Sequence, residues 1–201
     1  MPHPVQGISF SPLVFDLLED YVMTEQLFKR MAILGLTGSG KSSLVAYFTH
    51  NRLIEVRPTS GMQVTRMIVG KEEFPVMLID LGGGLAFQNT IWLEADFFDN
   101  VSALLYVVDS SAHENYESEQ AAFSLVLQNQ HLKGIPILII ANKVDLIKNQ
   151  TTIATQVSLA MNLVEAKIEH PDREISLIPI SLKTGMNVEQ IAEWIYRVAR
   201  K

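Results

Sequence analysis

The chain has no cysteine among its 201 residues. It can therefore form no disulfide, and it offers no thiolate as a nucleophile or metal ligand. This composition is typical of proteins from a reducing compartment, so we expect a cytoplasmic location. No apolar run approaches the ~20 residues that a membrane-spanning helix needs. The opening Met1-Pro2-His3-Pro4 also lacks the basic start of a cleavable secretory signal.

Basic residues are too few for a nucleic-acid partner. The chain has 16 Lys and Arg against 22 Asp and Glu, a formal net charge of −6, whereas phosphate backbones are bound by basic surfaces. Hydrophobic residues make up 48% of the chain, and a chain of this length can bury the core of one globular domain. We identify no internal repeat and no low-complexity segment.

The most informative motif is Gly35-Leu36-Thr37-Gly38-Ser39-Gly40-Lys41-Ser42, between an apolar run at 30–34 and a helical pattern at 43–48. Two glycines that bracket four residues before Lys and Ser are typical of a phosphate-binding loop. Glycines let backbone N–H groups turn toward phosphates, Lys41 supplies a positive charge, and the Ser42 hydroxyl suits Mg²⁺. The order of strand, loop and helix disfavours a chance glycine-rich turn. The residues expected to contact the nucleotide here are Thr37, Gly38, Ser39, Gly40, Lys41, Ser42 and Ser43.

A second motif, Asn142-Lys143-Val144-Asp145, indicates which base is bound. It follows the apolar run at 135–141 and so lies at the carboxyl end of a predicted parallel strand, where ligands bind in open α/β sheets. The Asp145 carboxylate can accept from both N1–H and the exocyclic amine of guanine, and adenine offers no such pair of donors. We therefore expect Asn142, Lys143 and Asp145 to bind guanine.

Ser181-Leu182-Lys183 follows another apolar run, at 175–180. The backbone of these three residues could donate to the O6 atom of guanine, which would place them in the same site. An ordinary turn between a strand and a helix is the alternative interpretation.

These motifs resemble those of the small GTPases of the Ras superfamily, and within it the ADP-ribosylation factor (Arf) family, from about Lys29 to the C-terminus. Pro58-Thr59 matches the first switch of that family, and Asp80-Leu81-Gly82-Gly83 matches the second. Four features favour the Arf branch. They are the paired Gly82-Gly83, the proline before Thr59, Ile91-Trp92 ahead of Phe97-Phe98, and Val107-Val108-Asp109-Ser110.

The resemblance implies a molecular switch that binds GTP or GDP with Mg²⁺ and hydrolyses GTP. It implies that Ser42, Thr59 and Asp80 hold the metal, Asp80 through water. It also implies that the Gly83 N–H donates to the γ-phosphate, so that Lys41, Thr59 and Gly83 form the catalytic set. The implied partners are an exchange factor, a GTPase-activating protein and effectors.

Gly84 departs from the family pattern, because a glutamine that orients the attacking water usually stands there. Since phosphoryl transfer depends on positioning and charge stabilisation, we expect slow intrinsic hydrolysis. Gln88 or Arg57 could compensate, although a surface glutamine and a solvated loop arginine are the simpler interpretations. The alternative function is a module that holds GTP without useful hydrolysis. An ATP-using P-loop kinase is disfavoured by Asp145 and by the switch motifs.

Strands and helices alternate along residues 29–201, which we interpret as the GTPase domain. The pattern predicts an α/β three-layer sandwich of the P-loop NTPase class, with a mostly parallel six-stranded sheet and helices on both faces. A hairpin from Met62 to Asp80, turning at Gly70-Lys71, supplies one antiparallel edge strand. Later helices are expected to begin near Glu114, Thr151 and Asn187. The last of them carries core residues at helical spacing, namely Ile191, Trp194, Ile195 and Val198.

Residues 1–28 form an extension with a predicted amphipathic helix, which Ser11 can cap and which Pro12 suits at its first turn. Its apolar arc and its acidic side are well separated. The apolar residues are Leu13, Val14, Phe15, Leu17, Leu18, Tyr21 and Val22, and the acidic ones are Asp16, Glu19 and Asp20.

Arf relatives carry a helix at this position that folds back with GDP and reaches a membrane with GTP. Here Pro2 excludes N-myristoylation, no C-terminal cysteine allows prenylation, and the acidic side would be repelled by anionic lipids. A permanently docked helix and a reversible contact with a membrane surface or partner both fit the pattern.

Overall fold

The computed structural model describes residues 28–59, 61–82, 98 and 100–201. The predicted N-terminal helix lies outside the described residues, as do Gly83, Gly84 and Gln88 and the Ile91, Trp92 and Phe97 positions of the Arf resemblance. The division of the chain at residue 28 therefore stays a prediction.

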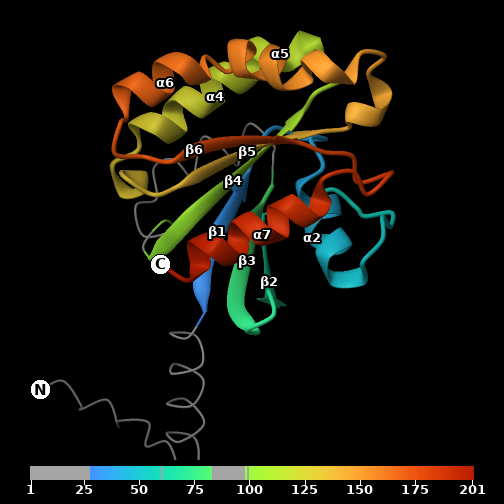
Figure 1. Cartoon of the computed structure of the whole chain (residues 1–201), viewed down its shortest axis with the longest axis vertical. Helices are drawn as coiled ribbons and strands as arrows, with labels where there is room; N and C mark the ends of the chain where they lie inside the picture. The colour runs from blue at the N-terminus through green and yellow to red at the C-terminus, as the bar shows by residue number, and fades with distance from the viewer. Residues whose placement is uncertain (1–27, 60, 83–97, 99) are drawn as a thin grey trace, which may run out of the picture.

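The described chain forms one six-stranded sheet in the order β2-β3-β1-β4-β5-β6, with helices on both faces (Figure 1). Five strands run parallel, and β2 is antiparallel to β3 at one edge. The predicted three-layer α/β sandwich is confirmed. The strands are β1 (Lys29–Leu34), β2 (Met62–Val69), β3 (Phe74–Leu81), β4 (Val101–Asp109), β5 (Ile137–Asn142) and β6 (Ile175–Pro179).

Among the described elements, three helices cover one face of the sheet and two cover the other (Figure 1). On the first face lie α4 (Tyr116–Gln128), α5 (Ile153–Ala160) and α6 (Leu163–Glu169), and on the second lie α2 (Lys41–His50) and α7 (Val188–Ala199). The described part of the chain also holds the 3-10 helices η2 (His113–Asn115), η3 (Gln130–Leu132), η4 (Val144–Leu146) and η5 (Gln150–Thr152). Within the described part of the chain, no helix is both long and apolar enough to cross a membrane.

Burial on both faces explains why the central strands are apolar over most of their length. In β1, Ala32 and Leu34 pack into the core beneath α4, while Met31 and Ile33 pack into the core beneath α2 and α7. Side chains of a strand alternate between faces, so a strand buried on both sides needs no polar residues. All six residues of β5 are buried for the same reason.

The hairpin between β2 and β3 lies where the sequence predicts it. Its turn spans 70–73, with positive φ angles at Gly70 (73°) and Glu73 (54°). A Cβ atom at Gly70 would lie 2.4 Å from Tyr196 Cδ2, so the turn packs closely against α7. The predicted core residues of α7 are all buried, since Ile191, Trp194, Ile195 and Val198 are at most 5% exposed.

The helix expected from about Thr151 is the one element that differs from the prediction. It divides into α5 and α6 at Met161-Asn162, where Asn162 has a φ of 50°. Asparagine tolerates this left-handed conformation better than most residues, so the chain turns there without a glycine.

Candidate functional site

The loop between β1 and α2 passes close to two neighbouring strands. A Cβ atom at Gly35 would lie 2.1 Å from the Val107 carbonyl oxygen of β4, and one at Gly40 would lie 2.3 Å from Asn142 Nδ2. Both glycines have positive φ angles, of 135° and 102°. Only glycine satisfies the backbone conformation and the close approach together.

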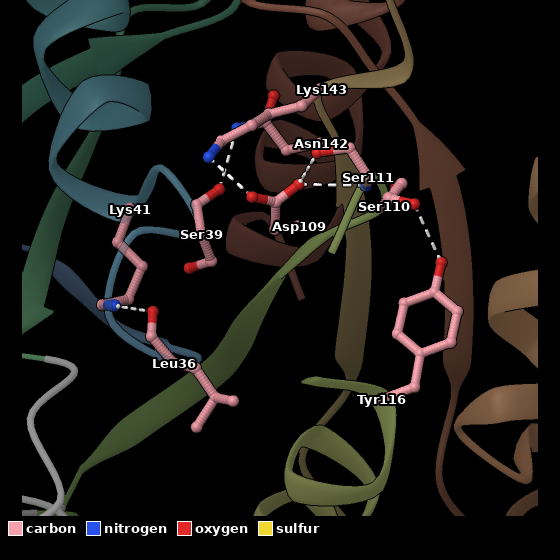
Figure 2. A network of polar contacts seen from close by, with 9 residues as sticks. All are labelled: Leu36, Ser39, Lys41, Asp109, Ser110, Ser111, Tyr116, Asn142 and Lys143. Atoms are coloured by element: carbon pink, nitrogen blue, oxygen red, sulfur yellow. Dashed lines mark hydrogen bonds and ion pairs between the residues drawn. The ribbon is translucent and has the colours of Figure 1, made fainter. Parts of the chain in front are cut away.

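Lys41 is the first residue of α2 and is buried, with 5% exposure. Its Nζ donates to the carbonyl oxygens of Gly35 (2.9 Å) and Leu36 (2.8 Å), and Figure 2 shows it reaching back over the loop. Burial lowers the pKa of Lys41, while the carboxylates of Asp80 and Glu119 act in the opposite direction. The ammonium group is therefore fixed inside the curve of the loop.

A cleft of about 210 Å³ opens beside this loop. Its two walls come from the loop with the start of α2, and from the segment before β2. They are Thr37, Gly38, Gly40, Lys41, Ser42 and Ser43 on one side and Val56, Arg57, Pro58 and Thr59 on the other. Arg57 lines the cleft and is exposed.

Three predicted metal ligands meet at the edge of the cleft. Ser42 Oγ lies 2.6 Å from Thr59 Oγ1, and both hydroxyls donate to Asp80 Oδ2, at 2.6 and 3.0 Å. Asp80 is 1% exposed, and its second oxygen, Oδ1, has no hydrogen-bond partner among the described residues. Hydroxyl and carboxylate oxygens are the ligands that Mg²⁺ prefers, so these residues fit the metal.

Gly82 explains part of the paired-glycine motif. Its N–H donates to the Gly61 carbonyl (2.8 Å), and a Cβ atom there would lie 2.8 Å from the Thr59 carbonyl oxygen. The end of β3 therefore packs directly on the backbone around Thr59. Any side chain at Gly82 would push Thr59 away from Ser42.

At the carboxyl end of β5, Asn142 joins the second predicted motif to the first. Its Nδ2 donates to the Ser39 carbonyl oxygen at 2.9 Å, across 103 residues of sequence (Figure 2). Lys143 follows with a φ of 65°, and its Nζ donates to Asp109 Oδ2 at 2.6 Å.

Asp109 is a member of the site that the sequence did not assign, although Val107-Val108-Asp109-Ser110 belongs to the Arf pattern. Its Oδ1 accepts from the N–H (3.0 Å) and the hydroxyl (2.6 Å) of Ser111. Burial raises the pKa of Asp109, but the hydrogen bonds from Lys143 and Ser111 outweigh it and lower that pKa below its ordinary value. Tyr116 steadies the same loop by donating to the Ser110 carbonyl at 3.0 Å (Figure 2).

The third predicted segment lies beside Asp145. Ser181 Oγ donates to Asp145 Oδ1 at 2.6 Å and accepts from the Thr184 N–H at 3.1 Å. The Val144 N–H also donates to the Ile180 carbonyl, at 3.2 Å. The sequence predicted only a backbone role here, so the side-chain contact from Ser181 was missed. Leu182 is buried and Lys183 is exposed.

The described site residues thus gather along the carboxyl ends of the parallel strands, and only Gly83 cannot be placed. The loop and Lys41 offer donors for phosphates, and Asp145 offers a carboxylate for a base. Among the described residues, no group of three or more His, Asp or Glu side chains could hold a metal. The oxygen cluster at Ser42 is therefore the candidate metal position.

Comparison with known proteins agrees with these motifs. Residues 15–199 match the model of the ADP-ribosylation factor family. ADP-ribosylation factor-like protein 8d of Arabidopsis thaliana is 30% identical over 166 residues, 82% of this chain and 88% of the relative. ADP-ribosylation factor-like protein 3 of Chlamydomonas reinhardtii is 24% identical over 168 residues, 84% of this chain and 89% of that protein.

Two solved structures share the fold. The Arl6 BBS3 small GTPase of Trypanosoma brucei, solved with the nucleotide analogue GppNp, gives a TM-score of 0.70 at 22% identity, covering 85% of this chain and 96% of that one. The mammalian SRP receptor gives 0.70 at 18% identity, covering 84% and 99%. With the family model matching nearly the whole described sequence, the chain belongs to the ADP-ribosylation factor family of small GTPases.

Proposed function

We propose that this Arf-family GTPase is a switch that binds GTP and GDP together with Mg²⁺ and hydrolyses GTP slowly. The observation that carries the proposal is the meeting of Ser42, Thr59 and Asp80 within 3.0 Å, beside the phosphate loop. These residues come from α2, from the segment before β2 and from β3. Such a convergence of hard oxygen ligands next to a lysine suits a metal-bound polyphosphate.

Phosphate binding would use the N-terminal end of α2 and the backbone N–H groups of Thr37–Ser43. The positive end of the helix and the Lys41 ammonium both favour negative charge. The space beside Gly38 is open to an approaching phosphate, because a Cβ atom at that position would meet nothing within 4 Å.

Bound Mg²⁺ would neutralise charge on the β- and γ-phosphates. Ser42 and Thr59 would hold it directly, and Asp80 through water, as the resemblance implies. The hydrogen bonds that now join these three side chains hold their oxygens close together at the edge of the cleft. The free lone pairs of Asp80 Oδ1 suit an ordered water.

Guanine would be bound at Asp145. The Ser181 hydroxyl donates to one carboxylate oxygen at 2.6 Å, which holds the Asp145 side chain in a single orientation. The Asp109 carboxylate fixes the Lys143 ammonium at 2.6 Å, and we propose that the aliphatic stem of Lys143 packs against the base. A carboxylate that receives two N–H donors from guanine would discriminate strongly against adenine, which would leave it unpaired.

Slow hydrolysis follows from Gly84, which has no side chain to orient water. Arg57 lines the cleft, but its exposure suits a solvated loop residue as well as a charge donor. The alternative remains a module that holds GTP as a fixed interaction surface without useful turnover. For the slow GTPase and for the non-hydrolysing module alike, we propose effectors and regulatory proteins as partners and a cytoplasmic location. We also propose a role in trafficking-type regulation, with reversible membrane contact through the N-terminal helix.

Single-turnover GTP hydrolysis tests the proposal. We expect unaided rates on the order of 10⁻⁴ s⁻¹ or slower for the wild type. Gly84→Gln should raise the rate without a large change in GTP affinity. Fast hydrolysis by the unmodified protein would contradict the role given to Gly84, and alanine substitution at Arg57 and Gln88 would then locate the compensating group. Tight GTP binding with no turnover in both proteins would favour the alternative module.

A further inference from the structure

Helix α4 buries a carboxylate beneath the phosphate loop. Glu119 is 2% exposed, and Tyr106 of β4 donates to its Oε2 at 2.9 Å. The same phenol lies 3.3 Å from the main-chain carbonyl of Glu119. The Leu36 N–H of the phosphate loop also donates to the Glu119 carboxylate. None of the motifs that define the nucleotide site includes this residue.

Helical spacing makes the burial of Glu119 unusual. Phe123 and Val126 follow it at intervals of four and three residues and are 1% and 0% exposed, so all three project toward the core. An apolar residue would be the ordinary choice at such a position, because a buried carboxylate must give up its hydration. The carboxylate therefore requires an explanation in terms of what it contacts.

Leu36 connects Glu119 to the charge that would bind phosphate. Its N–H donates to the Glu119 carboxylate, and its carbonyl oxygen accepts from Lys41 Nζ at 2.8 Å (Figure 2). Two peptide groups in succession are thus held by opposite charges, one from α4 and one from α2. Hydrogen bonds to ionised groups are about twice as strong as neutral ones, so an ionised Glu119 would hold the first turn of the loop more strongly than a protonated one.

We propose that Glu119 is a positioning residue for nucleotide binding, whose ionised carboxylate holds the Leu36 amide and so keeps the phosphate loop in its binding conformation. This inference rests on the proposed guanine-nucleotide function. It adds a pH dependence to that function, because the carboxylate holds the loop less strongly once it is protonated.

The charged groups that face Glu119 set the pH range. Burial is the largest influence on Glu119 and raises its pKa to about 7, and the negative charge of Asp109 acts in the same direction. The hydrogen bonds from Tyr106 and Leu36 and the positive charge of Lys41 lower this pKa, but by less. The carboxylate is therefore ionised above about pH 7 and loses its charge below it. We expect the loop to release nucleotide faster on the acid side.

Release of GDP carrying an N-methylanthraniloyl label, in excess Mg²⁺, tests this between about pH 5.5 and about pH 8.5. The variants are Glu119→Gln, Tyr106→Phe, and Glu117→Gln as an exposed control on the same helix. The terminal phosphate of the free nucleotide also titrates, near pH ~6, and this is common to the wild type and the variants. The difference between the wild type and Glu119→Gln removes that shared contribution.

We expect Glu119→Gln to release GDP roughly tenfold faster than the wild type at about pH 8, and to approach the wild-type rate in acid. Glu117→Gln should follow the wild type throughout. Tyr106→Phe should move the midpoint of the wild-type step to higher pH, because the lost hydrogen bond lowers the Glu119 pKa.

Equal release by Glu119→Gln and Glu117→Gln at every pH would overturn the inference, as would slower release by the wild type in acid. If circular dichroism shows that Glu119→Gln is unfolded, the Tyr106→Phe midpoint decides, and an unmoved midpoint overturns it. Each of these outcomes would overturn only the role of Glu119 and would leave the proposed guanine-nucleotide function standing. Absence of GDP binding by the wild type at any pH would instead refute the proposed function, and this inference with it.

Discussion

The carboxylate proposed to bind guanine is held by a second side chain. Ser181 Oγ donates to Asp145 Oδ1 at 2.6 Å, although the two residues are 36 positions apart. We predict that Ser181→Ala weakens GDP binding by roughly fivefold to tenfold, since a hydrogen bond to a charged group is lost. Isothermal titration with GDP measures the effect. Ser176→Ala, at the far end of β6, is the control, and equal affinities for the two variants would contradict the prediction.

Thr59 is predicted to distinguish the two nucleotides. Its hydroxyl lies against Ser42 and Asp80, the two other residues proposed to hold the metal. Thr59→Ala should leave GDP affinity nearly unchanged and weaken a non-hydrolysable GTP analogue, because the family's threonine meets the metal only with the γ-phosphate present. Equal losses for GDP and the analogue would show that Thr59 is not a switch residue.

At this scale the motifs predicted the residues of the site better than their contacts. Lys41 and Ser42 follow from residue types at fixed spacing, and Asp80 follows from the resemblance to the Arf family. Ser181 and Glu119 were not predicted in their side-chain roles, because their partners come from distant strands and loops. A buried glutamate within an apolar helical pattern is a visible signal, but it becomes interpretable only when the loop above it is known.

At the scale of elements, Glu174 ties the start of β6 to α7. Its oxygens accept from Trp194 Nε1 at 3.1 Å and from Arg197 Nη1 at 2.9 Å, and Arg197 Nη2 forms a second contact. The hydrogen bonds from Arg197 are the largest cause of a Glu174 pKa lowered from 4.5 to about 2, and burial acts weakly against them.

Because the pKa of Glu174 is lowered on folding, its ionised form stabilises the fold. That stability is fully present above pH 4.5 and is lost as the pH falls from 4.5 toward 2. We predict that Glu174→Gln lowers the free energy of unfolding by about 1 kcal/mol at neutral pH, a value reduced for partial solvent screening, and by much less near pH ~2.5. Urea unfolding at the two pH values measures this. A deficit that is equal at both would contradict the ion-pair explanation.

The elements themselves were largely predictable. Gly70, with a strand pattern on either side of it, predicted the hairpin. The helical spacing of Ile191, Trp194 and Val198 predicted the buried side of α7. The break between α5 and α6 was not predicted, because Asn162 enters a left-handed conformation that its neighbours in sequence do not signal. Local pattern determines where an element is apolar, whereas packing determines where it ends.

At the scale of the whole molecule, the N-terminal helix is predicted to respond to the nucleotide. If it is a switch, hydrogen exchange across residues 11–25 should increase with a GTP analogue relative to GDP, and flotation with liposomes should be stronger in the same state. The apolar residues Leu13, Phe15 and Leu17 are those that would be released. Equal protection in both states would favour a permanently docked helix.

The central claim is that the whole fold serves to bind a guanine nucleotide, and the base preference tests it most directly. Binding of GDP, ADP and xanthosine diphosphate is measured for the wild type and for Asp145→Asn, with Mg²⁺ present. We predict that the wild type prefers GDP over ADP by at least ~100-fold. Asp145→Asn should lose most GDP affinity and gain xanthine nucleotide binding, because the amide presents a donor where guanine also has one. Equal binding of GDP and ADP by the wild type, or undiminished GDP affinity in Asp145→Asn, would contradict the claim.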